Sequence, residues 1–414
     1  MNRREFLRQA ALLSGAALVS FGTRGWAARL GQAVNDSRRL IVIFLRGAVD
    51  GLNVVVPYGD PRYYQARTSI AIPKAGTGGG ALDLDGYFGL HPALAPLMPY
   101  WRNNTLGFVH ASGSPDPNRS HFEAQAYMET GAPGDGAITS GWMNRLVGAM
   151  PGTHTPTEAL SLGAVLPRIL TGPNAVSNLP LGRNAGRPLP IDRPRVADAF
   201  AALYQGDSPV DQAFKDGRQS RGELMRDIQQ DMENSYNGAP DVIGFSSDTT
   251  RLAQLMQRDA RVRLGFLSVG GWDTHVNQGA SQGQLATHLA ALGQGLNALV
   301  QGLGPLYRES LVLVMSEFGR TFRENGNAGT DHGHGNVLWL MGGGVNGGKV
   351  HGQWPGLADD QLYQNRDLAV TTDFRQVIST VLTRHLQLPD AKLASVFPDG
   401  IGVTATKLSG LFNA

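Results

Sequence analysis

The stretch Leu40-Ile41-Val42-Ile43-Phe44-Leu45 is an unbroken apolar run near the start of the chain. Such a run is typical of a strand that is covered on both faces, as in a parallel sheet, because none of its side chains has to face water. It is followed directly by the polar segment Arg46-Gly47-Ala48-Val49-Asp50-Gly51. We therefore predict that residues 40–45 form a strand of a parallel sheet, with Asp50 just beyond its carboxyl end.

Further apolar runs alternate along the chain with segments of helical periodicity. The expected strands lie at residues 105–111, 262–269, 311–315 and 336–341, and the expected helices lie at 91–103, 120–128, 284–303 and 373–386. Strands that alternate with helices predict an α/β fold with a mostly parallel central sheet sandwiched by helices. In such folds, ligands bind beyond the carboxyl ends of the strands.

Residues 38–414 are expected to form a single domain, but residues 150–250 differ in composition from the rest. This region is rich in Pro, Gly and Asn at first and then contains two amphipathic stretches, at residues 196–204 and 223–232. No internal repeat is visible. We therefore predict an inserted cap region at 150–250 within the α/β domain.

The amino-terminal segment has the layout of an export signal. Asn2-Arg3-Arg4-Glu5-Phe6-Leu7-Arg8 is a twin-arginine stretch, and it is followed by an apolar segment at residues 10–22 and by the small-residue site Gly25-Trp26-Ala27-Ala28. This pattern resembles a twin-arginine translocation (Tat) signal peptide, here residues 1–28. The alternative is a membrane anchor, but the apolar segment is shorter than the roughly 20 residues that a span requires. We expect a periplasmic or extracellular protein with no stable membrane span after cleavage.

Charge and cysteine content narrow the classes of partner and site. The net charge of the whole chain is +2; the signal contributes +3 (Arg3, Arg4, Arg8 and Arg24 against Glu5), so the mature chain is near −1. This balance argues against nucleic acid or an anionic membrane as a partner. The chain contains no cysteine, so an exported form has no disulfides. Any metal ion must then be held by histidine and carboxylate side chains.

Ionisable residues gather at the expected strand ends. Asp50 follows the first strand, Asp273 and His275 follow the strand at 262–269, Glu317 follows the strand at 311–315, and Asp331, His332 and His334 precede the strand at 336–341. We expect these segments to share one edge of the sheet and to bind a divalent metal ion such as zinc, manganese or calcium. The alternative for the last segment is a turn in which Asp331 caps the chain and both histidines are solvated.

Ser120 is the candidate nucleophile. It lies in Pro117-Asn118-Arg119-Ser120-His121-Phe122-Glu123, at the expected start of a helix, where backbone N–H groups favour anions. Arg119 is expected to orient a phosphate or sulfate group, and His121 is expected to act as a ligand, a proton donor or a residue of the helix face. The alternative is structural, because Ser120 followed three residues later by Glu123 is a capping box.

Several motifs taken together resemble a single family. They are Arg46-Gly47-Ala48-Val49-Asp50-Gly51-Leu52-Asn53, Arg119-Ser120-His121-Phe122, Gly271-Trp272-Asp273-Thr274-His275, Ser316-Glu317-Phe318-Gly319-Arg320-Thr321 and Asp331-His332-Gly333-His334-Gly335. This set covers nearly the whole mature chain and resembles the exported bacterial proteins known only as the domain of unknown function 1501 (DUF1501). That family is in turn similar to the alkaline phosphatase and sulfatase superfamily, which implies an α/β sandwich with a metal site at the strand ends.

The superfamily resemblance also implies roles for individual residues. Asp50 looks like its first-strand metal ligand, and Ser120 looks like its nucleophile at the start of a helix. Asp273 and His275 resemble its Asp/His metal pair, and His334 or His332 resembles its late histidine ligand.

One departure from the superfamily pattern concerns the strand at 311–315. In the superfamily, this strand usually leads into an Asp-His pair of ligands, whereas here it leads into Glu317-Phe318. Phenylalanine has no ligand atom. Either Asp331 and His332 supply the missing pair, or one of two metal ions is lost.

The sequence therefore favours an exported, metal-dependent hydrolase of phosphate or sulfate esters. The expected partners are a small-molecule or polymer ester substrate and the Tat export machinery. The alternative is a non-catalytic exported protein that keeps the fold and uses the polar cluster to bind a ligand or a structural ion within an envelope assembly.

Overall fold

The computed structural model describes residues 38–132, 138–163, 165–179, 244–398 and 408–413, with isolated positions between 198 and 215. Arg38–Ala414 cluster as one compact unit. The signal peptide expected at residues 1–28 lies outside the described residues. Within the described part of the chain, no helix is both long enough and apolar enough to cross a membrane.

A nine-stranded sheet forms the centre of the described structure, with β1 (Arg39–Leu45) in its middle. β1 pairs in parallel with β8 (Leu264–Val269) on one side and with β9 (Ser310–Ser316) on the other. The strand order is β11 (Val350–His351), β5 (Leu106–Gly113), β10 (Asn336–Gly342), β9, β1, β8, β6 (Ala159–Leu162) and β7 (Ser177–Leu179), and β12 (Thr372–Asp373) also pairs with β5. The expected mixed α/β architecture with a mostly parallel sheet is confirmed.

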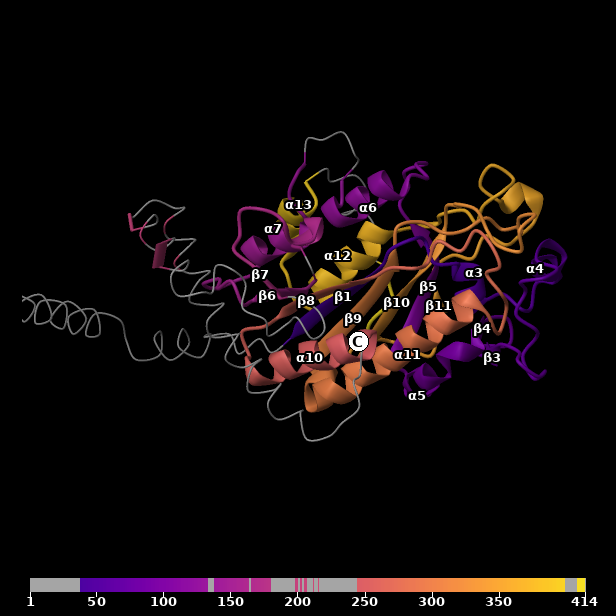
Figure 1. The fold of residues 1–414 in the computed structure, drawn as a ribbon, viewed down its shortest axis with the longest axis horizontal. Helices are drawn as coiled ribbons and strands as arrows, with labels where there is room; N and C mark the ends of the chain where they lie inside the picture. The colour runs from indigo at the N-terminus through magenta and orange to yellow at the C-terminus, as the bar shows by residue number, and fades with distance from the viewer. Residues whose placement is uncertain are drawn as a thin grey trace, which may run out of the picture. The chain divides into compact units, whose positions relative to one another are not determined.

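The direction of β10 explains how the predicted site segments come to one edge. β10 pairs antiparallel with both β5 and β9, whereas all other pairs of this sheet among the described residues are parallel. The start of β10 therefore lies at the same edge as the ends of β1, β5, β8 and β9. Polar segments that follow four strands and precede a fifth thus meet at this edge (Figure 1).

Helices cover both faces of the sheet (Figure 1). On one face lie η1 (Pro92–Leu97), α5 (Met98–Arg102), α10 (Phe245–Arg258) and α11 (Gln284–Leu303), and on the other lie α6 (His121–Thr130), α7 (Trp142–Ala149), α12 (Phe374–Arg384) and α13 (Asp390–Val396). Side chains of a strand alternate between faces, so Ile41 and Ile43 enter the first core and Val42 and Phe44 enter the second. This double coverage accounts for the unbroken apolar run of β1.

The remaining elements are short and lie in the connections. They are α3 (Gly51–Val54), β2 (Val55–Val56), α4 (Pro61–Ala66), β3 (Leu82–Asp83), β4 (Gly89–Leu90), η2 (Arg168–Leu170), η5 (Gly304–Glu309) and η6 (Asp359–Gln361). The strands β2, β4 and β3 form a small antiparallel sheet in that order.

Two sequence expectations differ from the fold. The helix expected at 91–103 is a 3₁₀ turn followed by a short α-helix, because Pro96 and Pro99 lack the N–H groups that a continuous helix needs. In the region expected to be a cap, β6 and β7 are instead strands that extend the central sheet. Most of the rest of 150–250 lies outside the described residues.

Candidate metal centre

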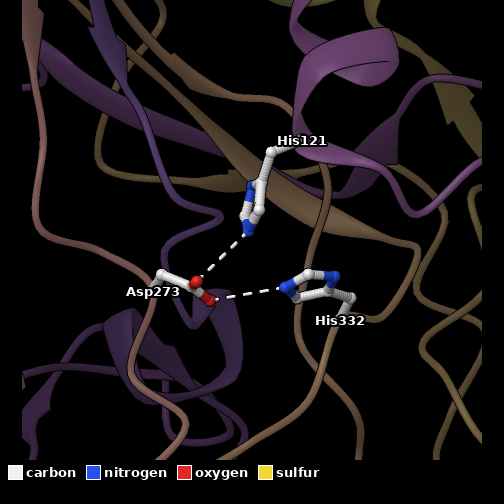
Figure 2. Close-up of side chains that lie close together, drawn as sticks. All are labelled: His121, Asp273 and His332. Atoms are coloured by element: carbon white, nitrogen blue, oxygen red, sulfur yellow. Dashed lines mark ion pairs between the residues drawn. The ribbon is translucent and has the colours of Figure 1, made fainter.

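Three histidines and one aspartate converge at the edge of the sheet where the polar segments meet. His121 is the first residue of α6, Asp273 and His275 lie in the loop after β8, and His332 lies in the loop before β10. Ligand atoms of His121, Asp273 and His332 all lie within 4.8 Å of one another (Figure 2). The four side chains keep exposed fractions between 26% and 43%, so the cluster opens to solvent.

The Nε2 atoms of all three histidines point to the carboxylate of Asp273. His275 Nε2 lies 2.9 Å and His332 Nε2 lies 3.4 Å from Oδ1, and His121 Nε2 lies 3.5 Å from Oδ2. Nε2 of His275 is 3.1 Å from Nε2 of His332. Ligand atoms placed about 2.0–2.1 Å from a tetrahedral zinc ion lie roughly 3.3 Å apart. The spacing in the cluster therefore fits atoms that share one metal ion.

Each of these histidines has an acceptor on its other ring nitrogen. Nδ1 lies 2.8 Å from Oε1 of Glu317 in His121, 3.1 Å from Oδ1 of Asp331 in His275, and 2.9 Å from the carbonyl oxygen of Arg119 in His332. A hydrogen on each Nδ1 leaves a lone pair on each Nε2. Such outer hydrogen bonds are typical of metal-binding histidines.

The cluster therefore presents several acceptor atoms close together, with the guanidinium of Arg320 bound to Oδ1 of Asp273 and 3.5 Å from Nε2 of His275. Nε2 of His121 is buried and has no hydrogen-bond partner among the described residues. A proton or a metal ion can bind such a nitrogen atom. Because the two compete for the same atoms, metal binding weakens as pH falls. The donor set of His121, Asp273 and His332 fits a divalent metal ion, and Nε2 of His275 lies beside this group, 2.9 Å from Oδ1 of Asp273.

The charge balance of the cluster agrees with a divalent cation. Burial acts to raise the pKa of Asp273, but Arg320 and His275 outweigh it and hold that pKa below its usual range. The pKa values of Glu317 and Asp331 are also lowered. Carboxylates of lowered pKa beside three imidazoles favour the binding of a cation.

Arg320 holds the carboxylate of Asp273 in place. Its guanidinium is buried and donates to Oδ1 of Asp273 at 2.5 Å. The same group donates to four carbonyl oxygens, those of Gly47, Ala48, Trp272 and Thr330. Because these carbonyls come from three loops, Arg320 fixes the loops as well as the carboxylate.

Glu317, which we predicted as a metal ligand, lies behind His121 instead. It is fully buried, and its Oε1 accepts from His121, from the backbone N–H of Gly47 and from Gln125, each at 2.8 Å. Burial acts to raise the pKa of Glu317, but the hydrogen bonds from His121 and Gln125 outweigh it and lower that pKa. The hydrogen bond to Glu317 in turn raises the pKa of His121. Glu317 thus orients His121 and lies outside the group of converging ligand atoms.

Asp331, like Glu317, contacts a histidine of the cluster on the ring nitrogen that faces away from Asp273. Its Oδ1 accepts from His275 and from Nδ2 of Asn325, which also donates to the carbonyl oxygen of His275. The hydrogen bond from Asn325 is the main cause that lowers the pKa of Asp331. Asp331 is thus part of the site, as a partner of His275.

Asp50 does not reach the cluster. Both of its oxygens contact the guanidinium of Arg67, at 2.5 and 3.0 Å, and Oδ2 also accepts from Gln278 at 2.7 Å. Asp50 and Arg67 are both fully buried. The prediction that Asp50 binds metal does not fit this arrangement, because its carboxylate is already bound to an internal cation.

Arg119 and His334 also lie apart from the cluster. The guanidinium of Arg119 pairs with Oδ2 of Asp367 at 2.7 Å, so only its carbonyl oxygen serves the site. His334 is buried and stacks on Tyr363 with ring centroids 4.3 Å apart. Burial lowers the pKa of His334 to about 4. Neither side chain occupies the place that we predicted for it.

Ser120 occupies the N-cap position of α6, next to His121. Its side chain is exposed and accepts no hydrogen bond from the first turn, whereas Nδ2 of Asn118 donates to Glu123. The expected capping box is therefore not formed. Ser120 immediately precedes His121, a member of the cluster, and is exposed to solvent.

Two glycines let the ligand-bearing loops pack backbone against backbone. A Cβ atom at Gly329 would lie 2.3 Å from the carbonyl carbon of His275, and one at Gly333 would lie 2.4 Å from that of Arg320. Both distances are closer than real Cβ atoms approach. A larger residue at Gly329 would push its loop away from that of His275, and one at Gly333 would push the segment of His332 away from Arg320.

Comparison with known proteins places the chain in a family. The sequence profile described as "Protein of unknown function (DUF1501)" matches residues 88–397, which include all four converging residues. The chain belongs to the DUF1501 family. The matched region of this DUF1501 protein excludes β1 and the Asp50–Arg67 pair.

Other comparisons add little to this assignment. No curated protein matches the DUF1501 chain. Among matching solved structures, Ps i-CgsB in complex with k-i-k-neocarrahexaose has a TM-score of 0.35 at 10% identity, covering 88% of this chain and 76% of that one. Ps i-CgsB alone has a TM-score of 0.30 at 11% identity, covering 87% and 76%. Scores this low carry no argument about fold or activity.

Proposed function

We propose that this DUF1501 protein is an exported, metal-dependent hydrolase of phosphate or sulfate esters. The observation that carries the proposal is the convergence of three histidine Nε2 atoms on the carboxylate of Asp273. The sequence resemblance to the alkaline phosphatase and sulfatase superfamily supports the same reaction class. The substrate is a small-molecule or polymer ester, and export proceeds through the Tat machinery to the periplasm or the outside of the cell.

The donor set favours a transition metal. Three imidazoles and one carboxylate suit zinc, and also manganese, better than calcium, which prefers oxygen ligands throughout. A bound ion of this kind lowers the pKa of a hydroxyl and offsets negative charge on an ester oxygen.

Ser120 is the residue that we assign as nucleophile. Ser120 is exposed and precedes His121 in the chain, and the first turn of α6 offers N–H groups to the oxygens of an anionic ester. Attack by Oγ on phosphorus or sulfur forms a covalent ester with Ser120 and releases the alcohol, and water then releases the phosphate or sulfate.

A non-catalytic, ligand-binding protein is the second candidate. The observation that favours it is the ion pair of Arg119 with Asp367, since an arginine held in this way is not placed to orient an anion. In that case the same cluster holds a structural ion.

Metal analysis of protein purified without chelator tests the shared part of both candidates. We expect one equivalent of zinc or manganese per chain, and its loss in Asp273→Ala. A matched control is Asp359→Ala, which removes an exposed carboxylate paired with Arg323. Protein that binds no divalent ion under these conditions contradicts both candidates.

Hydrolysis of a panel of aryl phosphates and sulfates separates the two candidates. We expect turnover by the metal-loaded protein and its loss in Ser120→Ala, while metal content and melting temperature stay unchanged. Metal-loaded protein that is inert towards the whole panel supports the non-catalytic candidate. Turnover that survives in Ser120→Ala indicates direct attack by water instead.

A further inference from the structure

Gln278 joins the two loops that carry most of the metal-binding residues. Its Oε1 accepts a hydrogen bond from the hydroxyl of Thr274 at 2.7 Å and another from the hydroxyl of Thr330 at 2.9 Å. Thr274 lies between Asp273 and His275, and Thr330 lies just before the segment of His332. The side chains of Gln278, Thr274 and Thr330 are fully buried. One amide oxygen thus contacts both loops where water does not reach.

The carboxylate of Asp50 determines how this amide is turned. Nε2 of Gln278 donates to Oδ2 of Asp50 at 2.7 Å. In the flipped amide, the oxygen of Gln278 would face the carboxylate, which has no hydrogen to donate. Since Asp50 fixes the NH₂ group, the amide oxygen must face the loops, and both threonine hydroxyls must donate to it.

Arg67 holds Asp50 in turn. All five N–H groups of its guanidinium have acceptors, and the fully buried pair therefore has no unmet donor. The acceptors are both oxygens of Asp50, Oδ1 of Asn53, and the carbonyl oxygens of Thr321 and Phe322. The chain of contacts from Arg67 through Asp50 and Gln278 to the two threonines is satisfied at every step.

We propose that Gln278 is a positioning residue that sets the separation of the loops at 273–275 and 330–332, and with it the geometry of the metal site. The inference rests on the proposed metal site and assigns Asp50 to the same supporting network. A metal site tolerates errors of only about 0.2 Å in ligand distances. Oδ1 of Asp273 and Nε2 of His332 lie 3.4 Å apart, one on each loop. Because Gln278 contacts both loops, it helps to set this distance.

Isosteric substitutions at the threonines test this role without opening a cavity. Thr274→Val and Thr330→Val each remove one hydroxyl and keep the shape, whereas Thr274→Ser and Thr330→Ser keep the hydroxyl and lose a methyl group. The affinity for Zn²⁺ is measured by titration against a competing chelator, and the absorption spectrum of the Co²⁺-loaded protein reports ligand geometry. We expect each valine variant to bind Zn²⁺ about 10–100-fold more weakly, which is the usual effect of losing an outer partner.

The serine variants and the wild-type protein make the outcomes distinguishable. We expect the serine variants to bind within about threefold of wild type, and the valine variants to show an altered Co²⁺ spectrum. Valine variants that unfold more easily but bind Zn²⁺ as tightly as wild type overturn the inference, as do serine variants that lose as much affinity as valine. If only one of the two valine variants folds, its Zn²⁺ affinity and Co²⁺ spectrum are enough to decide between these outcomes. Wild-type protein that binds no metal overturns the proposed function itself, and this inference with it.

Discussion

Nδ1 of His121 lies 2.8 Å from Oε1 of the fully buried Glu317, so the histidine enters the cluster with its orientation already set. Glu317 lies on the Nδ1 side of the His121 ring, outside the group of ligand atoms to which Nε2 of His121 belongs. The same division into ligand and support recurs in His275 with Asp331 and in His332 with the carbonyl oxygen of Arg119.

Glu317→Gln tests this division of roles. We expect metal affinity to fall about tenfold or more without being abolished, because a neutral amide orients His121 less firmly than a carboxylate does. Asp273→Asn should abolish binding under the same conditions. Titration with Zn²⁺ against a chelator measures both, and Glu123→Gln, an exposed carboxylate on the same helix, is the control. Equal losses in Glu317→Gln and Asp273→Asn would show that Glu317 is itself a ligand.

Arg67→Met tests the buried ion pair. The substitution leaves Asp50 as a buried carboxylate without its cation, and we expect the free energy of unfolding to fall by about 3–5 kcal/mol. Arg62→Met is the matched control, because Arg62 is half exposed and lies 3.7 Å from Asp60. Breaking that surface pair should cost less than about 1 kcal/mol. Urea denaturation measures both, and similar losses in the two variants would contradict the prediction.

Acid sensitivity should follow from the buried neutral histidines. Burial lowers the pKa of both His91 and His110 to about 4, and the two ring nitrogens of His110 are engaged with Val55 and Ala111. Between pH 6.5 and 4 the unfolded chain takes up protons at these histidines and the native protein does not. The contribution of these histidines to the free energy of unfolding is therefore fully present above pH 6.5 and is lost as pH falls toward 4. The loss is at most about 3 kcal/mol for each histidine, at about 1.4 kcal/mol per pKa unit.

His110→Gln provides the test of that assignment, since its amide can still donate to the carbonyl oxygen of Val55. We expect the variant to lose less stability than wild type between pH 6.5 and 4 in urea denaturation. Identical pH profiles for the two proteins would rule out His110 as a source of the acid sensitivity.

Export can be tested by exchanging the paired arginines. Arg3→Lys together with Arg4→Lys keeps the charge of the signal but removes the twin-arginine motif. We expect the exchanged protein to stay in the cytoplasm, as measured by cell fractionation, while Arg8→Lys is exported normally. Normal export of the doubly exchanged protein would contradict the Tat assignment.

The apolar runs predicted the fold well because burial on both faces of a sheet leaves a direct mark on the sequence. The runs at 40–45, 311–315 and 336–341 all coincide with strands, and the helix at 284–303 has the predicted bounds. An apolar run does not encode strand direction, however. The reversal of β10 became evident only from its pairing with β5 and β9.

The site was predictable as a set of segments but not residue by residue. Asp273, His275 and His332 lie together as expected, because strand ends share an edge. The ion-pair partner of Asp50 could not be predicted from the sequence, because Arg67 follows a short helix that has no distinctive sequence pattern. Gln278 was missed for the same reason: an amide has no motif of its own, and only its contacts reveal its role.

The close backbone contacts at Gly329 and Gly333 have a consequence for ligand affinity. Loops that touch along their main chains have few alternative conformations to lose when an ion arrives. The entropic penalty of ordering has then already been met during folding, and most of the interaction free energy is available for binding. The metal-free and metal-loaded proteins should accordingly be almost superimposable around Asp273.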